Sequence, residues 1–247
     1  MAVKLTSTRE AARSNGIKVL VYGMAGAGKT RLSATTGGRP IIISAESGLL
    51  SLRDVDIPVI EVQSITDVHA AYEYLASSAE GQQFDWICLD SISEIAEVVL
   101  GYEKKTNKDP RAAYGQLSEQ MNDLLRAFRD LPGRNVYMSA KLERIKDENT
   151  GAVMFGPSMP GQRLSQALPY LFDEVFALRA EKDSEGVLQR ALQTQPDFTY
   201  QAKDRSGALD MFEAPNLAAI AAKIIHQPAA PAANPNAAEP AAEPQEA

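Results

Sequence analysis

The sequence is poor in the features that mark secreted and membrane proteins. It has one cysteine in 247 residues, Cys88, so an intrachain disulfide is excluded. No apolar run approaches the roughly 20 residues that a membrane-spanning helix needs. The opening segment MAVKLTSTREAARSNG has no apolar core of the kind found in secretory signals. These absences predict a cytoplasmic protein in which Cys88, inside an apolar run, is a small core residue.

Excess positive charge is absent as well. The formal net charge is -7, which excludes a protein that coats nucleic acid by bulk electrostatics and leaves only local contacts through loops. Residues 227–247 are rich in alanine and proline, carry three glutamates, and lack basic and large apolar side chains. Such a segment cannot offset the entropy of ordering. We therefore expect a disordered acidic tail there, acting as a solubilising extension or as a partner-binding tail.

Between a short extension over residues 1–16 and that tail, residues 17–226 alternate strand-like and helical patterns. The apolar strand-like runs are Ile17–Tyr22, Pro40–Ser44, Val59–Val62, Trp86–Leu89 and Asn135–Ala140. The helical patterns are Lys29–Thr35, Thr66–Ala79, Ile92–Tyr102, Ala112–Asp130 and Asn216–Ile225. Apolar strands separated by helices predict one α/β domain, a mostly parallel sheet with helices on both faces. Shorter segments, Glu174–Arg179, Val187–Gln193 and Phe198–Ala202, are typical of antiparallel strands at one edge.

The stretch GMAGAGKT, Gly23 to Thr30, satisfies the pattern GxxxxGK[ST] and lies between a buried strand and a helix. In this context the backbone N–H groups converge on a β-phosphate, Lys29 reaches the β- and γ-phosphates, and Thr30 ligates Mg²⁺. The sequence therefore predicts a site for a nucleoside triphosphate such as ATP with Mg²⁺. Its predicted binding residues are Gly23, Met24, Ala25, Gly26, Ala27, Gly28, Lys29, Thr30 and Arg31.

Two acidic residues follow buried strands. Asp90 ends the run WICLD about 60 residues after the lysine, and we expect it to hold Mg²⁺ through water. Glu46, in SAES, comes directly after the strand Pro40–Ser44. A carboxylate there can polarise the water that attacks the γ-phosphate, although an exposed glutamate in such a loop is also ordinary.

The order of GxxxxGKT, SAES after a strand, and Asp90-Ser91 after a strand resembles the RecA-like recombination ATPases. More narrowly, residues 17–209 are similar to phage-encoded RecA-like nucleotide-binding proteins, which include ATP-dependent single-strand annealing proteins. The resemblance implies a RecA-like P-loop core, ATP hydrolysis with Glu46 as the base, and action on single-stranded DNA. In that family a polar residue ending the next strand senses the γ-phosphate. This chain has no glutamine there, and Ser139 or Lys141 would have to serve.

A second resemblance involves Lys203, Arg205 and Gly207 in YQAKDRSGALD. Their spacing is similar to the K-x-R-x-G segment of hexameric replicative helicases with RecA-like cores, in which the lysine and arginine reach a neighbouring subunit's γ-phosphate. This implies a catalytic role for Lys203 and Arg205 in a homo-oligomer, ring or filament. The alternative is a solvated hairpin tip with two basic residues.

Two further segments, GYEKKTNKDPRAAYGQ and ERIKDENTGAVMFGPSMPGQR, suit the family's DNA loops. Basic side chains can follow phosphates while an aromatic ring stacks on a base. The alternative for each is a solvated charged loop. The candidate DNA-binding residues are Lys104, Lys105, Lys108, Arg111, Arg144, Lys146, Phe155 and Arg163.

Two functions remain open at this point. The first is an ATPase, in a bacterial host cytoplasm, that binds single-stranded DNA and promotes annealing or recombination in phage DNA metabolism, beside a single-strand-binding protein or other phage recombination proteins. The second is a nucleotide-dependent switch or loader that recruits other replication proteins and does not itself pair DNA. An oligonucleotide gel shift at low salt discriminates the two.

Overall fold

The structure, a computed structural model, describes residues 5–7, 10, 15–46, 48–146 and 151–226. Most of the expected extension over 1–16 and the whole of the expected tail over 227–247 lie outside the described residues. None of the described helices has both the length and the apolar character needed to cross a bilayer.

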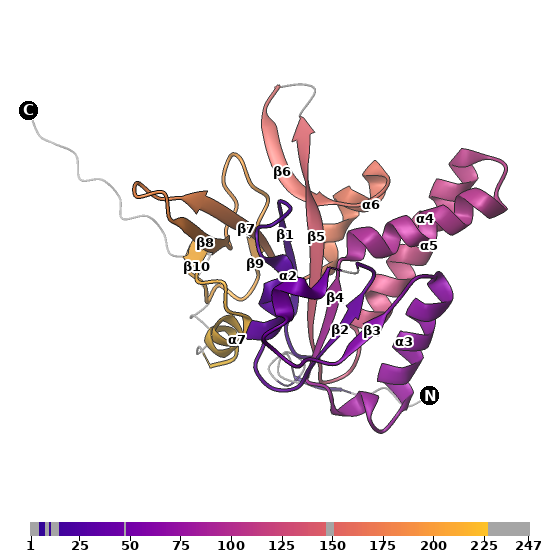
Figure 1. Cartoon of the computed structure of the whole chain (residues 1–247), viewed down its shortest axis with the longest axis horizontal. Helices are drawn as coiled ribbons and strands as arrows, with labels where there is room; N and C mark the ends of the chain where they lie inside the picture. Colours follow the sequence, from indigo (N-terminus) through magenta and orange to yellow (C-terminus); the bar gives the residue numbers. More distant parts are fainter. Residues whose placement is uncertain (1–4, 8–9, 11–14, 47, 147–150, 227–247) are drawn as a thin grey trace, which may run out of the picture.

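Within the described residues, ten strands form one sheet in the order β10-β8-β7-β1-β5-β4-β2-β3, with β6 paired to β5 and β9 to β7 (Figure 1). The strands joined by parallel pairing are β1 (Lys18–Gly23), β2 (Pro40–Ser44), β3 (Val59–Glu61), β4 (Trp86–Asp90), β5 (Asn135–Lys146) and β7 (Glu174–Lys182). The antiparallel additions are β6 (Val153–Ser158), β8 (Leu188–Gln193), β9 (Lys203–Asp204) and β10 (Phe212–Glu213). The predicted mostly parallel α/β sheet is confirmed.

Helices cover both faces of this sheet. They are α2 (Lys29–Leu32), α3 (Ile65–Ser77), α4 (Ile92–Thr106), α5 (Pro110–Arg129), α6 (Gln162–Ala167) and α7 (Leu217–His226). Along β1, Leu20 and Tyr22 enter the core shared with α3, α4 and α5, while Val19 and Val21 enter the core shared with α2 and α7. Side chains alternate across a strand, so a strand that is apolar at every position must be covered on both sides.

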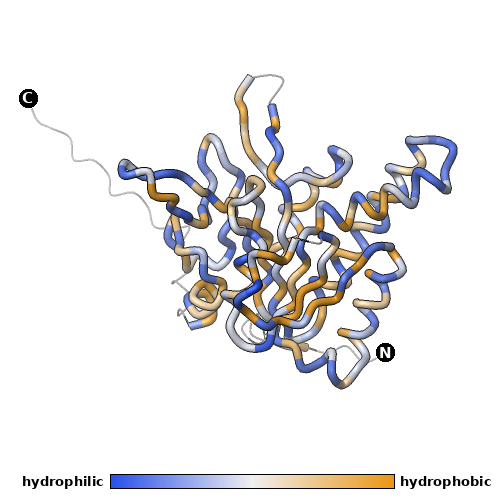
Figure 2. The backbone as a smooth tube through the Cα atoms, viewed as in Figure 1, coloured by the Kyte–Doolittle hydropathy of each residue, from blue (hydrophilic) through white to orange (hydrophobic). Residues whose placement is uncertain are grey.

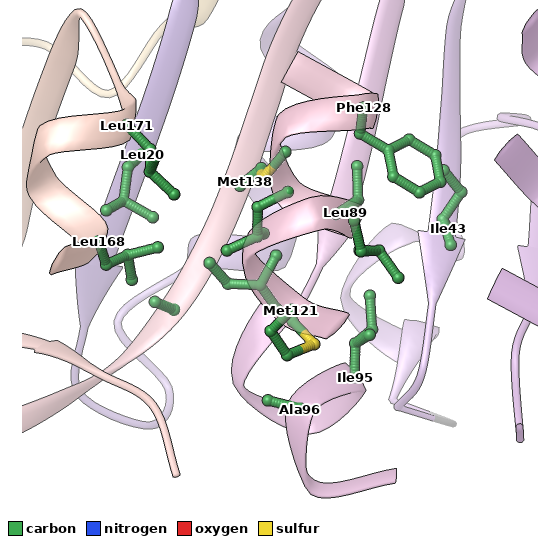
Figure 3. Close-up of a cluster of buried hydrophobic side chains, with 14 of the residues drawn as sticks. Leu20, Ile43, Leu89, Ile95, Ala96, Met121, Phe128, Met138, Leu168 and Leu171 are labelled. Carbon is green, nitrogen blue, oxygen red and sulfur yellow. The ribbon is translucent and has the colours of Figure 1, made fainter. Parts of the chain in front are cut away.

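Figure 3 shows the larger of these two cores, in which Met121 and Phe128 of α5 lie against the sheet residues Leu89 and Met138. All four side chains are fully buried. The hydropathy colouring of Figure 2 places the apolar residues on the central strands and the hydrophilic ones at the protruding ends. Burying apolar surface contributes roughly 25 cal/mol per Å², and this core fixes the carboxyl ends of the strands that carry the candidate site.

The first segment predicted as a DNA loop is a helical hairpin. α4 continues to Thr106 and α5 begins at Pro110, so the expected ends at Tyr102 and Ala112 are wrong. Asp109 caps α5 by accepting a hydrogen bond from the Arg111 amide, with Pro110 in the first turn. This cap-and-proline signal was present in the sequence and identifies the start of a helix. The two helices project together from the sheet (Figure 1).

The second segment predicted as a loop is mostly a β-hairpin. β5 runs past the expected end at Ala140 to Lys146 and pairs antiparallel with β6. The expected strand Phe198–Ala202 is also wrong, because that segment contributes only an isolated bridge from Tyr200 to Phe155. The residues that follow this segment, Lys203 and Asp204, form β9 and pair with β7. Long-range pairing decided both outcomes, and local patterns do not encode it.

Candidate functional site

The turn between β1 and α2 wraps a loop of backbone around an open space. Gly26 and Gly28 have φ of 75° and 110°, a region that side-chain-bearing residues rarely adopt. The Tyr137 hydroxyl donates a hydrogen bond of 2.7 Å to the Lys29 carbonyl and so anchors the start of α2 on β5. The loop is therefore held in shape by the fold, as a backbone cradle for an anion requires.

A cavity of about 840 Å³ lies at this edge of the sheet. It gathers side chains from loops and strands that are far apart in the sequence. Of the predicted nucleotide, catalytic and metal residues, the following line it: Gly23, Met24, Ala25, Gly26, Gly28, Lys29, Thr30, Arg31, Glu46 and Asp90. A cavity of this size suits a ligand as large as a nucleotide.

Lys29 folds back onto its own loop. Its ammonium donates to the carbonyl oxygens of Gly23 and Met24, at 2.8 and 3.0 Å. Burial lowers the pKa of Lys29, while the negative charges of Asp90 and Glu46 act in the opposite direction. Among the described residues, the ammonium has no ionised partner in direct contact, and an anionic ligand in the cavity would supply one.

The two carboxylates are each held by a serine. The Ser91 hydroxyl donates to Glu46 Oε1 at 2.7 Å, and the same oxygen, Ser91 Oγ, accepts from the Glu94 amide as the cap of α4. The Ser139 hydroxyl donates to Asp90 Oδ1. Ser139 is fully buried and so lies beneath Asp90 and not within the cavity. Glu46 is exposed, so its free oxygen can meet water or ligand.

Lys141 and Arg31 also line the cavity, but each has an acidic partner. Lys141 pairs with Glu94, and this contact raises the pKa of Lys141. Arg31 forms an ion pair of 2.5 Å with Asp54. Ser139 and Lys141, the two alternatives considered for γ-phosphate sensing, therefore occupy different places: Lys141 faces the cavity and Ser139 supports Asp90.

The residues present fit a magnesium ion. Mg²⁺ keeps several waters and takes one or two protein oxygens together with the phosphates of a substrate. The Thr30 hydroxyl and the Asp90 carboxylate both line the cavity and meet this need. No cluster of three or more histidine, cysteine or acidic residues suited to a metal occurs among the described residues.

Two cavity features were not found from the sequence. The link from Ser91 to Glu46 joins residues 45 positions apart and has no sequence signature. Arg190, on the antiparallel strand β8, lines the cavity and donates from Nε to the Ala27 carbonyl at 2.9 Å. A basic residue in an edge strand is common, and only the pairing of β8 with β7 brings this one to the loop.

Lys203 and Arg205 lie at the opposite end of the strands. β9 pairs with β7 at Glu174, which in turn pairs with Val19 at the start of β1. The cradle follows the end of β1, so neither side chain can reach it within the same chain. Lys203 donates to the Pro169 carbonyl at 2.9 Å, and Arg205 pairs with Asp173 at 2.7 Å.

Most of the DNA candidates are exposed on the two hairpins. Lys104 and Lys105 lie in the last turn of α4, and Lys108 lies between α4 and α5. The protruding end of this helical hairpin is hydrophilic (Figure 2). The Lys104 ammonium is 5.4 Å from the centre of the Tyr114 ring. Arg144 and Lys146 are exposed side chains near the end of β5. Phe155 differs from these exposed candidates. The centre of its ring lies 5.2 Å from that of Tyr200, and its backbone forms hydrogen bonds with residues 199 and 201.

A second cavity, of about 640 Å³, joins the two DNA candidate segments. It lies between α5 and the start of α6, and Arg111, Tyr114 and Arg163 line it together. One carboxylate, Glu119, lines it as well. Glu103 fixes the helices on one side of it by accepting a hydrogen bond of 2.7 Å from Gln120 of α5. The fold therefore brings an arginine and a tyrosine of the first segment and an arginine of the second into one groove.

A comparison with protein families agrees with this description, since a family model described as an AAA domain matches residues 15–206. A similar solved structure is that of a KaiC-like protein from the hyperthermophilic archaeon Pyrococcus horikoshii OT3, with 15% sequence identity and a TM-score of 0.42. That alignment covers 72% of this chain and 77% of the archaeal one. None of the curated proteins matches the chain.

Proposed function

The chain belongs to the AAA-domain family of P-loop ATPases, and from that premise we propose that it hydrolyses ATP while bound to single-stranded DNA. The observation that supports hydrolysis is the cavity in which Lys29, Asp90 and Glu46 meet the backbone cradle. This combination serves phosphoryl transfer to water, which depends on positioning and on stabilising charge.

Each residue has a role in this proposal. The cradle amides bind the phosphates, and Lys29 leaves the Gly23 and Met24 carbonyls to neutralise them. Thr30, and Asp90 through water, would hold Mg²⁺, which would supply positive charge beside the transferred group. Glu46 accepts a proton from the attacking water, and Ser91 keeps its carboxylate in one orientation. Ser91 is thus a positioning residue.

Two measurements test the proposed ATP hydrolysis: calorimetry with MgATP for binding, and an assay of phosphate release for turnover. We expect binding with heat and slow release of phosphate that rises on assembly or on adding DNA. Absence of any heat with MgATP would reject the nucleotide site. Binding without phosphate release in any condition would reject hydrolysis and leave a nucleotide-dependent switch.

The groove of Arg111, Tyr114 and Arg163 supports the DNA part of the proposal. Single strands bind where basic side chains contact phosphates and an aromatic face is available to a base. Tyr114 is 41% exposed, so its ring is accessible. We propose that a single strand crosses this groove, with the lysines near the end of the α4–α5 hairpin and Arg144 and Lys146 of β5 as flanking contacts.

Fluorescence anisotropy with a labelled oligonucleotide at low salt tests the groove. Arg111→Ala with Arg163→Ala should weaken binding and flatten its salt dependence, because fewer counterions are released when fewer phosphates are neutralised. Lys182→Ala, which removes one exposed positive charge on β7, is the control for each single variant, Arg111→Ala and Arg163→Ala, and should bind like the wild type. No binding by the wild type at low salt would favour the switch or loader instead.

Assembly completes the proposal. Since Lys203 and Arg205 lie at the far end of the strands from their own cradle, we propose that they act on the nucleotide of a neighbouring copy in a homo-oligomer. A finger of this kind contributes a factor of about 10³ or more. Strand annealing or recombination in phage DNA metabolism would then be the cellular role. Mass measurement with an ATP analogue and single-stranded DNA tests this, and a monomer under all conditions would contradict it.

A further inference from the structure

The nucleotide cavity has two unequal sides. Glu46, Asp90 and Lys141 come from the direction of β2, β4 and β5, on one side of β1. Leu178, Arg190 and Pro215 come from the direction of β7, β8 and β10, on the other side. The first side carries the residues assigned to the γ-phosphate. The second side, one cation among apolar groups, has no role in the function proposed above.

Arg190 is fixed beside the phosphate cradle. Its partner across the hairpin is Ala180 of β7, which lies beyond Ala177, the partner of Tyr22 on β1. The side chain therefore overhangs the loop that follows β1. Its Nε donates to the Ala27 carbonyl, and a Cβ placed on Gly28 would lie 3.4 Å from that nitrogen. Arg190 is thus in contact with the part of the cradle whose amides surround a phosphate.

The terminal nitrogens of Arg190 remain available. Within the described part of the chain, no carboxylate pairs with this guanidinium, and its one hydrogen bond uses Nε. Arg31 and Lys141, the other long cations of the cavity, are paired with Asp54 and Glu94. A guanidinium held at Nε and free at its two terminal nitrogens is suited to two oxygens of a phosphate.

We infer that Arg190 binds the nucleotide of its own chain, by donating from its terminal nitrogens to the α- and β-phosphates on the side of the cradle away from Glu46. This inference rests on the proposed nucleotide site and adds a residue to it. ATP and ADP share the α- and β-phosphates, so the contact is the same for both. The β7–β8 hairpin then becomes part of the binding site, and its position is linked to whether nucleotide is bound.

Calorimetry of the full chain with MgADP and MgATP tests the inference, using Arg190→Ala, Arg190→Lys and Arg190→Gln. We expect Arg190→Ala to weaken both nucleotides about equally, by roughly 10- to 100-fold, as for removal of a hydrogen bond to a charged group. Arg190→Lys should recover part of the affinity because it keeps the charge. Lys182→Ala, on the same hairpin, is the control and should bind like the wild type.

The variants also distinguish a phosphate contact of Arg190 from a purely structural role, in which its hydrogen bond to Ala27 only stabilises the loop. Glutamine can still donate to the Ala27 carbonyl but has no charge, so full affinity in Arg190→Gln would overturn the inference. So would wild-type affinity in Arg190→Ala, or a loss confined to ATP. Failure of the wild type to bind either nucleotide would instead reject the nucleotide site itself, and the two failures are therefore distinguishable.

Discussion

At the carboxyl end of the parallel strands, the charged side chains of Lys29, Glu46 and Asp90 are held by neutral partners, whereas at the amino end two pairs of ionisable side chains face one another. Lys29 is held by two carbonyls, Glu46 by Ser91 and Asp90 by Ser139. At the other end Arg205 pairs with Asp173, and Glu174 lies against Asp204. Neutral partners orient a charge without cancelling it. At the carboxyl end the charges therefore remain available to a ligand, whereas at the amino end the charged groups interact with one another within the chain.

The amino-end pair of carboxyl groups has a specific explanation. Glu174 is 2% exposed, and its Oε2 has no hydrogen-bond donor among the described residues. Burial, followed by the charge of Asp204 and a hydrogen bond with it, raises the pKa of Glu174 to about 8. The pKa of Asp204 is lowered despite its burial, by hydrogen bonds from Ser206 and the Leu209 amide among others. Glu174 therefore keeps its proton to a higher pH than an ordinary glutamate does, beside Asp204 of β9.

The largest expected effect is at the carboxyl end. Lys29→Ala should reduce MgATP affinity below detection, because it removes the cation that is held at the cradle by carbonyl oxygens and is assigned to the β- and γ-phosphates. Calorimetry measures the binding, and thermal unfolding of the ligand-free variant checks that the fold is intact. Near-normal MgATP affinity in a folded variant would contradict the proposal that the Lys29 ammonium binds the phosphates.

Glu46→Gln should separate binding from chemistry. The amide accepts the Ser91 hydrogen bond but cannot take a proton from water, so MgATP affinity should stay within a few-fold while turnover falls by about 10²- to 10⁴-fold. Single-turnover phosphate release measures the step. Equal turnover in variant and wild type would exclude Glu46 as the base.

Glu174→Gln tests the pairing of carboxyl groups at the amino end through the pH dependence of stability. The folded-state pKa of Glu174, about 8, lies above its ordinary value of 4.5, so the wild type loses stability as pH rises through that window. The glutamine variant does not ionise, and its advantage in free energy of unfolding should grow between pH 5 and pH 8 by on the order of 3 kcal/mol. Urea denaturation measures it, with exposed Glu185→Gln as the control. A constant difference across pH would show that Glu174 is ionised in the fold.

The smallest expected effect on stability is that of Arg205→Ala. The Arg205–Asp173 pair is largely exposed, with side-chain exposures of 63% and 41%, and such pairs contribute less than about 1 kcal/mol. Urea denaturation of the isolated chain checks this. A loss of several kcal/mol in the free energy of unfolding would show that the pair stabilises the fold, and would weaken the case that Arg205 acts on a neighbouring copy. In parallel, the ATP turnover of the assembled protein should fall strongly in this variant even though its stability changes little.

Much of the candidate site at the carboxyl end was predictable from the sequence, because its main residues lie in short segments at the ends of apolar strands. The strand Pro40–Ser44 has the predicted bounds, and the cradle lies between β1 and α2 as expected. The hairpins were not recognised as such. Asp109 and Pro110 carried a usable signal for a helix start, whereas the pairing of β5 with β6 depends on two segments that are separated in the sequence.

The amino acid sequence by itself determined the alternation of buried strands and helices and the cradle, since both follow from local periodicity and from glycines that permit positive φ. Only the tertiary structure decided which distant side chains meet. It put Ser91 on Glu46, Arg190 on the cradle, and Arg111 beside Arg163, and it put Lys203 and Arg205 at the other end of the strands. The reason is that strand order and register come from packing of the whole chain, to which no short segment has access.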